Sequence, residues 1–215
     1  MNTRRRLALI FVLVMPISAI HFAHAQNLDV DILKGINPQY PNSQIWMQTS
    51  NSAYAAPLSI AVGQMSYGII AKDRHERNNS FEMLMSVGVA SLLSQSMKAS
   101  VNRMRPQYKY PDEIFSLTPA RTKSFPSGHA TIAFATATTL TLQYKKWYIA
   151  VPAYAWAAGV SYSRMYEGKH YPSDLLAGAN WNRKWFSLSL VVKKAIQMIH
   201  QHSFIVSHHF KFPLS

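Results

Sequence analysis

The sequence predicts an all-α protein, a helical bundle with a C-terminal tail of uncertain structure. Three long stretches carry no charge and are too long for ordinary strands, namely Ala53–Ala71, Met83–Met97 and Trp147–Ser163. Small polar residues dilute each stretch, and the mean hydropathy of the chain is only −0.06. We therefore expect buried helices of a soluble bundle, with integral membrane helices as the alternative. The 215 residues suffice for one domain with its own core.

The first 25 residues have the pattern of a signal peptide. Three arginines at positions 4–6 precede an apolar run over residues 7–20, and Ala23 and Ala25 place small residues where a signal peptidase reads. We expect cleavage after Ala25 and export. The alternative is an uncleaved helix that anchors the protein to a membrane, although the apolar run is short for a full span.

The next segments are expected to alternate between irregular structure and helix. Residues 26–54 are polar and interrupted by Pro38 and Pro41, which predicts an irregular segment with at most one short helix. A helix is expected over Pro57–Ile70, because proline is permitted in a first turn. The charged residues 72–79 then predict a solvated connection.

A second helix is expected from an N-cap at Ser80 to about Met104, where Pro106 ends it. Residues 107–125 form a long loop of the kind that often carries function. Three more helices should follow, and the small residues at 177–179 should let a neighbouring helix approach the last of them closely. Their expected bounds are Gly128–Tyr144, Trp147–Met165 and Pro172–Trp181.

This reading divides the chain into a leader (1–25), an irregular segment (26–54), a helical domain (55–182) and a C-terminal extension (183–215). The extension is compatible with a strand near its start and a helix after it. It holds four histidines without neighbouring carboxylates or cysteines, so we expect no metal site there. These are His200, His202, His208 and His209.

Charge and composition narrow the function classes. The chain has 22 Lys and Arg against 9 Asp and Glu, a formal charge of +13, and about +10 remains without the three leader arginines. A positive field favours phosphate esters, anionic lipid head groups or nucleic acid. No dense basic block interleaved with aromatics occurs, so nucleic acid is not expected. Cysteine is absent, which excludes disulfides and thiolate chemistry.

Three short patterns carry candidate chemistry. Lys98 and Arg105 are seven residues apart, two helical turns, so both cations should point the same way and bind an oxyanion. Ser127 and Gly128 open a helix whose N–H groups favour an anion, and His129 would stand beside that anion as a proton donor. Taken singly, these patterns also fit a solvated basic stripe and an ordinary capped helix.

The third pattern contains Arg164, His170 and Asp174. Pro172 should open a helix, which places the histidine just before it and the carboxylate in its first turn. A carboxylate there can fix one imidazole N–H and leave the other nitrogen free to attack. A purely structural His–Asp hydrogen bond is the alternative. Together the three patterns supply what phosphoryl transfer needs: cations, a nucleophile and an acid.

The patterns K-x6-R-P (98–106), P-S-G-H (126–129) and S-R-x5-H-x3-D (163–174) resemble the type-2 phosphatidic acid phosphatase superfamily. This superfamily includes class A bacterial acid phosphatases and vanadium haloperoxidases. The resemblance covers roughly residues 55–180 and implies a helical bundle of the acid phosphatase and haloperoxidase type. It also implies a bacterial, periplasmic phosphatase that needs no metal or other cofactor.

The resemblance further implies roles for individual residues. His170 would be the nucleophile, Asp174 its orienting partner and His129 the general acid. Phosphate oxygens would be bound by Lys98, Arg105, Ser127, Gly128 and Arg164.

We therefore expect hydrolysis of phosphate monoesters through a phosphohistidine. The substrate would be a small soluble ester or a lipid phosphate, the latter with peripheral membrane contact, and the sequence does not indicate an oligomeric state. Vanadate-dependent halide oxidation is a related alternative, but the haloperoxidases of the family are much longer chains than this one. A phosphate-binding protein without turnover would need only the cations, not the intact histidines.

Overall fold

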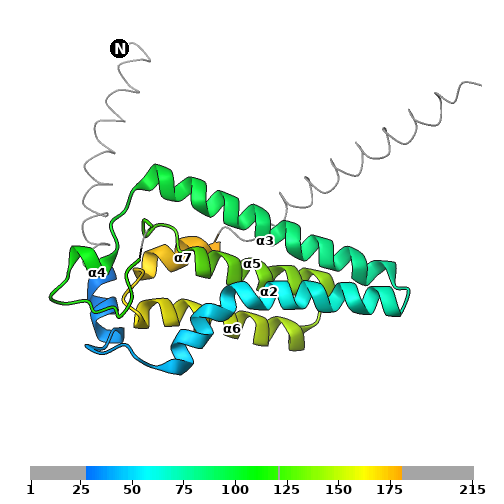
Figure 1. The fold of residues 1–215 in the computed structure, drawn as a ribbon, viewed down its shortest axis with the longest axis horizontal. Coiled ribbons are helices and arrows are strands. Elements are labelled where there is room, and N and C mark those ends of the chain that lie inside the picture. The colour runs from blue at the N-terminus through cyan, green and yellow to red at the C-terminus, as the bar shows by residue number, and fades with distance from the viewer. Residues whose placement is uncertain (1–27, 121, 181–215) are drawn as a thin grey trace, which may run out of the picture.

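The computed structural model describes residues 28–120 and 122–180, and these form a bundle of helices (Figure 1). A first helix spans residues 28–36. It is followed by α2 (Gln44–Ile70), α3 (Arg74–Val101), the short α4 (Pro106–Lys109), α5 (Gly128–Tyr144), α6 (Trp147–Tyr166) and α7 (Pro172–Asn180). No strand occurs within the described residues, which confirms the all-α prediction. The leader and the C-terminal extension lie outside the described part of the chain.

The prediction for the N-terminal part needs correction, because α2 begins at Gln44 and Pro57 lies inside the helix. Residues 26–54 are therefore not mainly irregular. Tertiary contacts hold the additional turns: the ring of Trp46 lies 4.5 Å from that of Tyr162 on α6. In Figure 1 the first part of α2 is inclined to the rest, as expected for a helix with an internal proline.

The bounds of α3 also differ from the prediction. Asp73 is the N-cap, and its carboxylate accepts hydrogen bonds from the backbone N–H groups of His75 and Glu76. The predicted cap, Ser80, is instead buried and donates to the Ala61 carbonyl of α2 at 2.7 Å. At the other end, Asn102 adopts the left-handed conformation and ends the helix before Met104.

The second half of the bundle follows the prediction closely. Helices α5 and α6 have the expected bounds to within a residue, and α7 begins at Pro172 as expected. A Cβ atom on Gly178 would lie 3.0 Å from Oγ1 of Thr131, which confirms the close approach of α7 to α5. Between α3 and α5 the predicted long loop is present, except that its first residues form α4.

The core is built from small residues, which let the helices pack closely. Its largest cluster joins α2, α5 and α6 and consists of Ala53, Ala133, Ala137, Ala157 and Val160. A second cluster joins the first helix to the loop and to the residue before α7, and consists of Val30, Leu33, Ile114 and Tyr171. This second cluster lies beside the candidate site described below.

The three uncharged stretches are only partly buried. Among the described residues, no helix combines the length and apolar character required to cross a bilayer. Yet many large apolar side chains on the outer faces of α2, α3 and α6 are exposed, so the expectation of wholly buried helices was wrong. They include Leu58, Val62, Ile69, Ile70, Leu92, Trp147 and Val151.

Candidate active site

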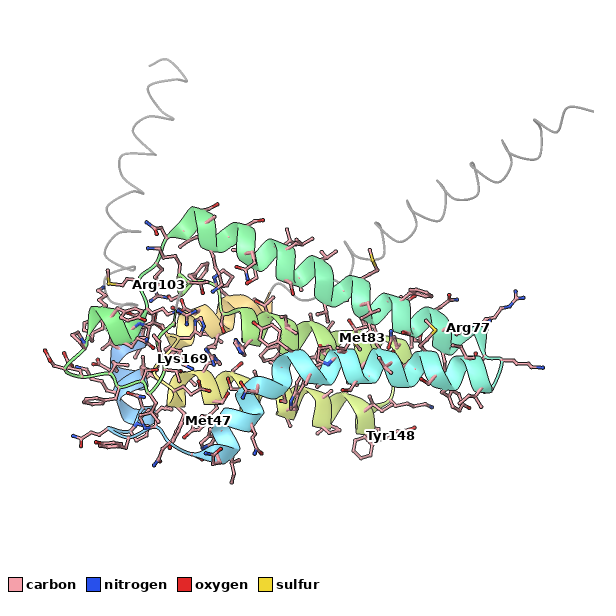
Figure 2. The ribbon with its side chains drawn as sticks, viewed as in Figure 1. Met47, Arg77, Met83, Arg103, Tyr148 and Lys169 are labelled. Carbon is pink, nitrogen blue, oxygen red and sulfur yellow. The ribbon has the colours of Figure 1, made fainter. Side chains whose placement is uncertain are left out.

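The candidate residues of all three sequence patterns meet at one end of the bundle. Figure 2 labels two of their neighbours, Arg103 and Lys169, which lie at this end, whereas Arg77 and Tyr148 lie toward the other. The site is formed by the last turn of α3 and the chain that follows it, the last turn of α6 and the N-terminal ends of α5 and α7. Its central ionisable side chains are almost wholly buried.

His170 and Asp174 form the buried centre of the site. Nδ1 of His170 lies 3.3 Å from Oδ2 of Asp174, and the same carboxylate oxygen accepts a hydrogen bond from the backbone N–H of Tyr171. These partners assign the Nδ1–H tautomer, so Nε2 keeps its lone pair. Burial, helped by the nearby Arg105, lowers the pKa of His170 well below its usual value. The imidazole is therefore neutral at neutral pH, as a nucleophile must be.

Arg105 faces the free nitrogen of His170. Its Nη1 donates to Nε2 of His170 at 3.0 Å and to the Lys169 carbonyl at 2.8 Å. Nε and Nη2 are held by the carbonyl and hydroxyl oxygens of Thr122. Burial and the neighbouring Arg164 lower the pKa of Arg105 to about 10, which still leaves it charged at neutral pH.

Lys98 belongs to the same site, although not for the reason predicted. Because α3 ends at Val101 and Asn102 turns the chain, two helical turns do not separate Lys98 from Arg105. Lys98 is nevertheless buried, donates to the Lys123 carbonyl at 2.8 Å, and is electrostatically coupled to Arg105. Burial, followed by this like charge, lowers its pKa to about 8.

Arg164 comes from the last turn of α6 and is also buried. Its Nη1 donates to Oγ of Ser50 at 2.6 Å and to Oε2 of Glu167 at 3.1 Å, while Nε has no protein partner. Glu167 also accepts from Lys169 at 2.5 Å. A buried guanidinium with a free N–H is suited to bind an anion.

The N-terminus of α5 completes the site. Ser127 caps the helix as predicted, since its hydroxyl accepts from the backbone N–H of Ala130. The N–H of Ser127 donates to the Asp174 carbonyl at 3.1 Å, which ties α5 to the first turn of α7. The N-terminus of α5, which begins at Gly128 and carries the positive end of the helix dipole, therefore adds to the positive charge of the site.

His129 packs with its ring edge-on to Tyr54, with the ring centroids 4.7 Å apart. Burial, helped by Arg164 and His170, lowers the pKa of His129 to about 2. Burial and the protein's own charges thus keep His129 neutral. A phosphate bound among the cations would oppose them and favour the imidazolium.

The structure adds residues that the sequence patterns did not identify. Arg103 donates to Asp174 and to Asp29, Ser50 supports Arg164, and Tyr54 contacts His129. Arg103 occupies one of the unspecified positions of the first motif, whereas Ser50 and Tyr54 lie outside all three, and each of them reaches the site through tertiary contacts. Within the described residues, no group of three or more His, Cys, Asp or Glu side chains could hold a metal ion.

The family model of the PAP2 superfamily matches residues 79–191, more than half of the chain. A lipid A 1-phosphatase of Rhizobium etli is 34% identical over 110 residues, which are 49% of this chain and 46% of that protein. An undecaprenyl-diphosphatase of Sulfolobus acidocaldarius is 34% identical over 112 residues, 49% of this chain and 50% of that protein. The chain spans about half the length of the curated relatives it matches.

Two crystal structures share the fold. A transmembrane PAP2-type phosphatidylglycerolphosphate phosphatase from Bacillus subtilis has a TM-score of 0.63 at 22% identity, covering 88% of this chain and 96% of that chain. LpxE from Aquifex aeolicus has a TM-score of 0.61 at 24% identity, covering 76% of this chain and 94% of that chain. These likenesses confirm the fold type that the sequence patterns implied.

Proposed function

Because this chain belongs to the PAP2 superfamily, we propose that it is a phosphatase that hydrolyses phosphate monoesters through a phosphohistidine on His170. One observation carries the proposal. His170 is buried and neutral, its Nδ1–H is directed at Asp174, and its Nε2 lies 3.0 Å from the guanidinium of Arg105. This is the arrangement of a nitrogen nucleophile beside a cation that can hold its target.

In the first step, Nε2 of His170 attacks the phosphorus atom and the bond from phosphorus to the ester oxygen breaks. Before this attack, the hydrogen bond from Arg105 to Nε2 must pass to a phosphate oxygen, which frees the lone pair. Asp174 accepts the hydrogen bond from Nδ1–H of His170 throughout and stabilises the cationic phosphohistidine. In the second step water attacks the phosphorus and the phosphorus–nitrogen bond breaks, which releases phosphate.

The leaving alcohol needs a proton, and His129 is the proposed donor. Because burial and the protein's own cations keep the pKa of His129 low, it gains its proton only together with the anionic substrate. In the second step the neutral imidazole takes a proton from the attacking water. Substrate binding and proton uptake are thus coupled at this residue.

The phosphate oxygens would be bound by Lys98, Arg105 and Arg164, helped by Ser127 and Gly128 at the start of α5. Support comes from the unpartnered Nε of Arg164 and from the electrostatic coupling of Lys98 to both arginines. Charge on three sides stabilises the equatorial oxygens of the transferring group.

We propose a lipid phosphate, rather than a small soluble ester, as the substrate. The relatives act on lipid A or on undecaprenyl diphosphate by their names. Exposed apolar side chains on α2, α3 and α6 also favour contact with a lipid surface. We therefore infer a membrane-associated protein, exported through its N-terminal leader and acting on the periplasmic side.

The test is release of phosphate by the purified full-length chain and by His170→Ala. Both proteins are assayed with p-nitrophenyl phosphate and with a lipid phosphate in mixed micelles. Loss of a nucleophile should reduce turnover by more than about a thousandfold. Turnover on lipid alone supports the substrate proposal. Turnover that survives in His170→Ala refutes the mechanism, and a folded wild-type chain that binds phosphate without hydrolysis indicates a binding protein.

A further inference from the structure

The guanidinium of Arg103 joins the proposed nucleophile pair to the first helix. We propose that Arg103, anchored by Asp29, is a positioning residue that holds Asp174, and through it His170, in the geometry needed for attack. This inference rests on the proposed function, because it gives Arg103 a task in the reaction of His170.

Arg103 follows α3 and uses both of its terminal nitrogens. Nη1 donates to Oδ1 of Asp174 at 2.6 Å and to Oγ of Ser173 at 2.7 Å, and Nη2 donates to Oδ2 of Asp29 at 2.8 Å. Asp29 also accepts from the backbone N–H of Ser173 at 2.9 Å and from its hydroxyl. The ring of Tyr171 lies 4.0 Å from the guanidinium carbon. The side chain is therefore held on several sides.

The two carboxylate oxygens of Asp174 accept hydrogen bonds from different donors. Oδ2 accepts from His170 and from the backbone of Tyr171, whereas Oδ1 accepts from Arg103. Without Arg103, a wholly buried carboxylate oxygen would lose its strongest partner, and buried unpaired charge is costly. The carboxylate would then rotate or take up a proton, and either change misplaces the imidazole.

The charge balance around Asp174 agrees with this role. Burial raises the pKa of Asp174, and the charge of Arg103 is the largest influence that lowers it. Removing this cation would therefore favour the protonated acid, which cannot orient His170 in the same way. The charged or titratable groups that face Asp174 are Lys98, Arg103, Arg105, His170, Tyr171 and, through Arg103, Asp29.

Asp29 connects the first helix to this network. It lies in the helix over residues 28–36, which is outside the region 79–191 matched by the family model. The same helix contributes Val30 and Leu33 to the apolar cluster around Tyr171. The first helix thus supports the site by packing and by one buried carboxylate.

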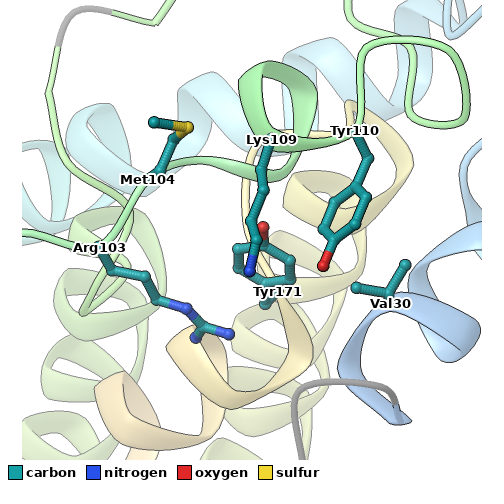
Figure 3. Close-up of a pocket in the computed structure, with 6 residues that line it drawn as sticks. All are labelled: Val30, Arg103, Met104, Lys109, Tyr110 and Tyr171. Carbon is teal, nitrogen blue, oxygen red and sulfur yellow. The ribbon is translucent and has the colours of Figure 1, made fainter. Parts of the chain in front are cut away.

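A pocket beside Arg103 makes the proposal testable by chemical rescue. The cavity has a volume of about 280 Å³ and is lined by Val30, Arg103, Met104, Lys109, Tyr110 and Tyr171. Figure 3 shows the side chain of Arg103 at this pocket, with Lys109 and Tyr171 beside it. Truncation to alanine would leave a hole continuous with the pocket, wide enough for a guanidinium ion to enter from solution.

The experiment compares Arg103→Ala with wild type in the full-length chain. We expect kcat to fall about 10- to 100-fold, by analogy with the loss of partners that orient metal-bound histidines. KM should change little, because Arg103 bonds to no predicted phosphate ligand. The acid limb of the kcat profile should move to higher pH, since Asp174 loses its nearest cation. Arg103→Lys keeps the charge and should restore that limb in part.

Guanidinium chloride at tens of millimolar should raise kcat of Arg103→Ala several-fold. Urea, which has a similar shape and no charge, should not. His170→Ala should gain nothing from guanidinium. The matched control is Lys109→Ala, because Lys109 lines the same pocket and does not contact Asp174. This variant should keep the wild-type kcat and the wild-type acid limb of the pH profile.

A rise in KM with unchanged kcat would overturn the proposal and assign Arg103 to substrate binding. An acid limb that does not shift in Arg103→Ala, together with no rescue by guanidinium, would also overturn the proposal. If Arg103→Ala does not fold, Asp29→Asn provides the test: kcat should fall with KM unchanged, and wild-type kcat would refute the anchor. The proposed function fails separately, if His170→Ala retains turnover in the same assay.

Discussion

The buried ammonium group of Lys98 should set the alkaline limit of activity. Burial and the neighbouring Arg105 lower its pKa to about 8, whereas Arg105 itself keeps its charge to about pH 10. Lys98 is charged below pH 8 and loses its proton as the pH rises through 8. The free enzyme therefore loses one of the three proposed phosphate-binding cations in this range.

The size of the effect follows from that pKa. With a pKa of about 8, the protonated fraction of Lys98 falls to about one tenth at pH 9. For p-nitrophenyl phosphate, whose leaving group needs no proton from His129, kcat/KM should therefore be about tenfold lower at pH 9 than at pH 7. Phosphate monoesters, with a second pKa near 6, are already dianions over this range and add no second slope. The pH profile of kcat/KM reports ionisations of the free enzyme and is the quantity to measure.

Lys98→Arg is the decisive comparison. An arginine keeps its proton across the range, so the limb near pH 8 should disappear while the decline near pH 10 from Arg105 remains. Circular dichroism at pH 7 and pH 9 would check that both proteins stay folded. An unchanged limb near pH 8 in Lys98→Arg would refute the assignment of this ionisation to Lys98.

Two further predictions concern the leaving group and the fold. His129→Ala should slow hydrolysis of alkyl phosphates by about 10²- to 10⁴-fold, but p-nitrophenyl phosphate much less, because nitrophenolate leaves without a proton; equal losses in kcat/KM on both would remove His129 as the acid. Gly168 has a φ of +65°, and a Cβ atom there would press on the Phe115 carbonyl, so Gly168→Ala should destabilise the fold by more than about 2 kcal/mol and lower Tm by at least about 4 °C. Gly63→Ala, with nothing within 4 Å of the added methyl group, is its control in the same thermal melt and should not lower Tm.

Local signals in the sequence predicted the second half of the bundle well. Ser127 caps α5 and Pro172 opens α7, and both signals act within one helical turn. The starts of α2 and α3 were missed for a different reason. Pro57 resembled a first-turn proline, but contacts of Trp46 and Ser50 with α6 support a longer helix. Asp73 caps α3 within a charged run that resembled a solvated loop.

The candidate site shows the same division. The motif residues could be grouped from the sequence because each motif is short and its residue types suit the binding of an anion, although the helical spacing expected for Lys98 and Arg105 was wrong. Arg103 could not be assigned, since its partners Asp29 and Asp174 are 74 and 71 residues away in the chain. The low pKa of His129 could not be predicted from the sequence either, because it arises from burial and from cations on other elements.

The central claim is a covalent phosphohistidine on His170, and trapping it is the most direct test. The full-length chain is mixed with ³²P-labelled substrate, quenched in alkali within milliseconds, and separated from free label. We expect label that is stable in alkali and lost in acid, present in the wild-type chain and absent from His170→Ala. Label that survives in His170→Ala, or that is lost in alkali, would contradict the account.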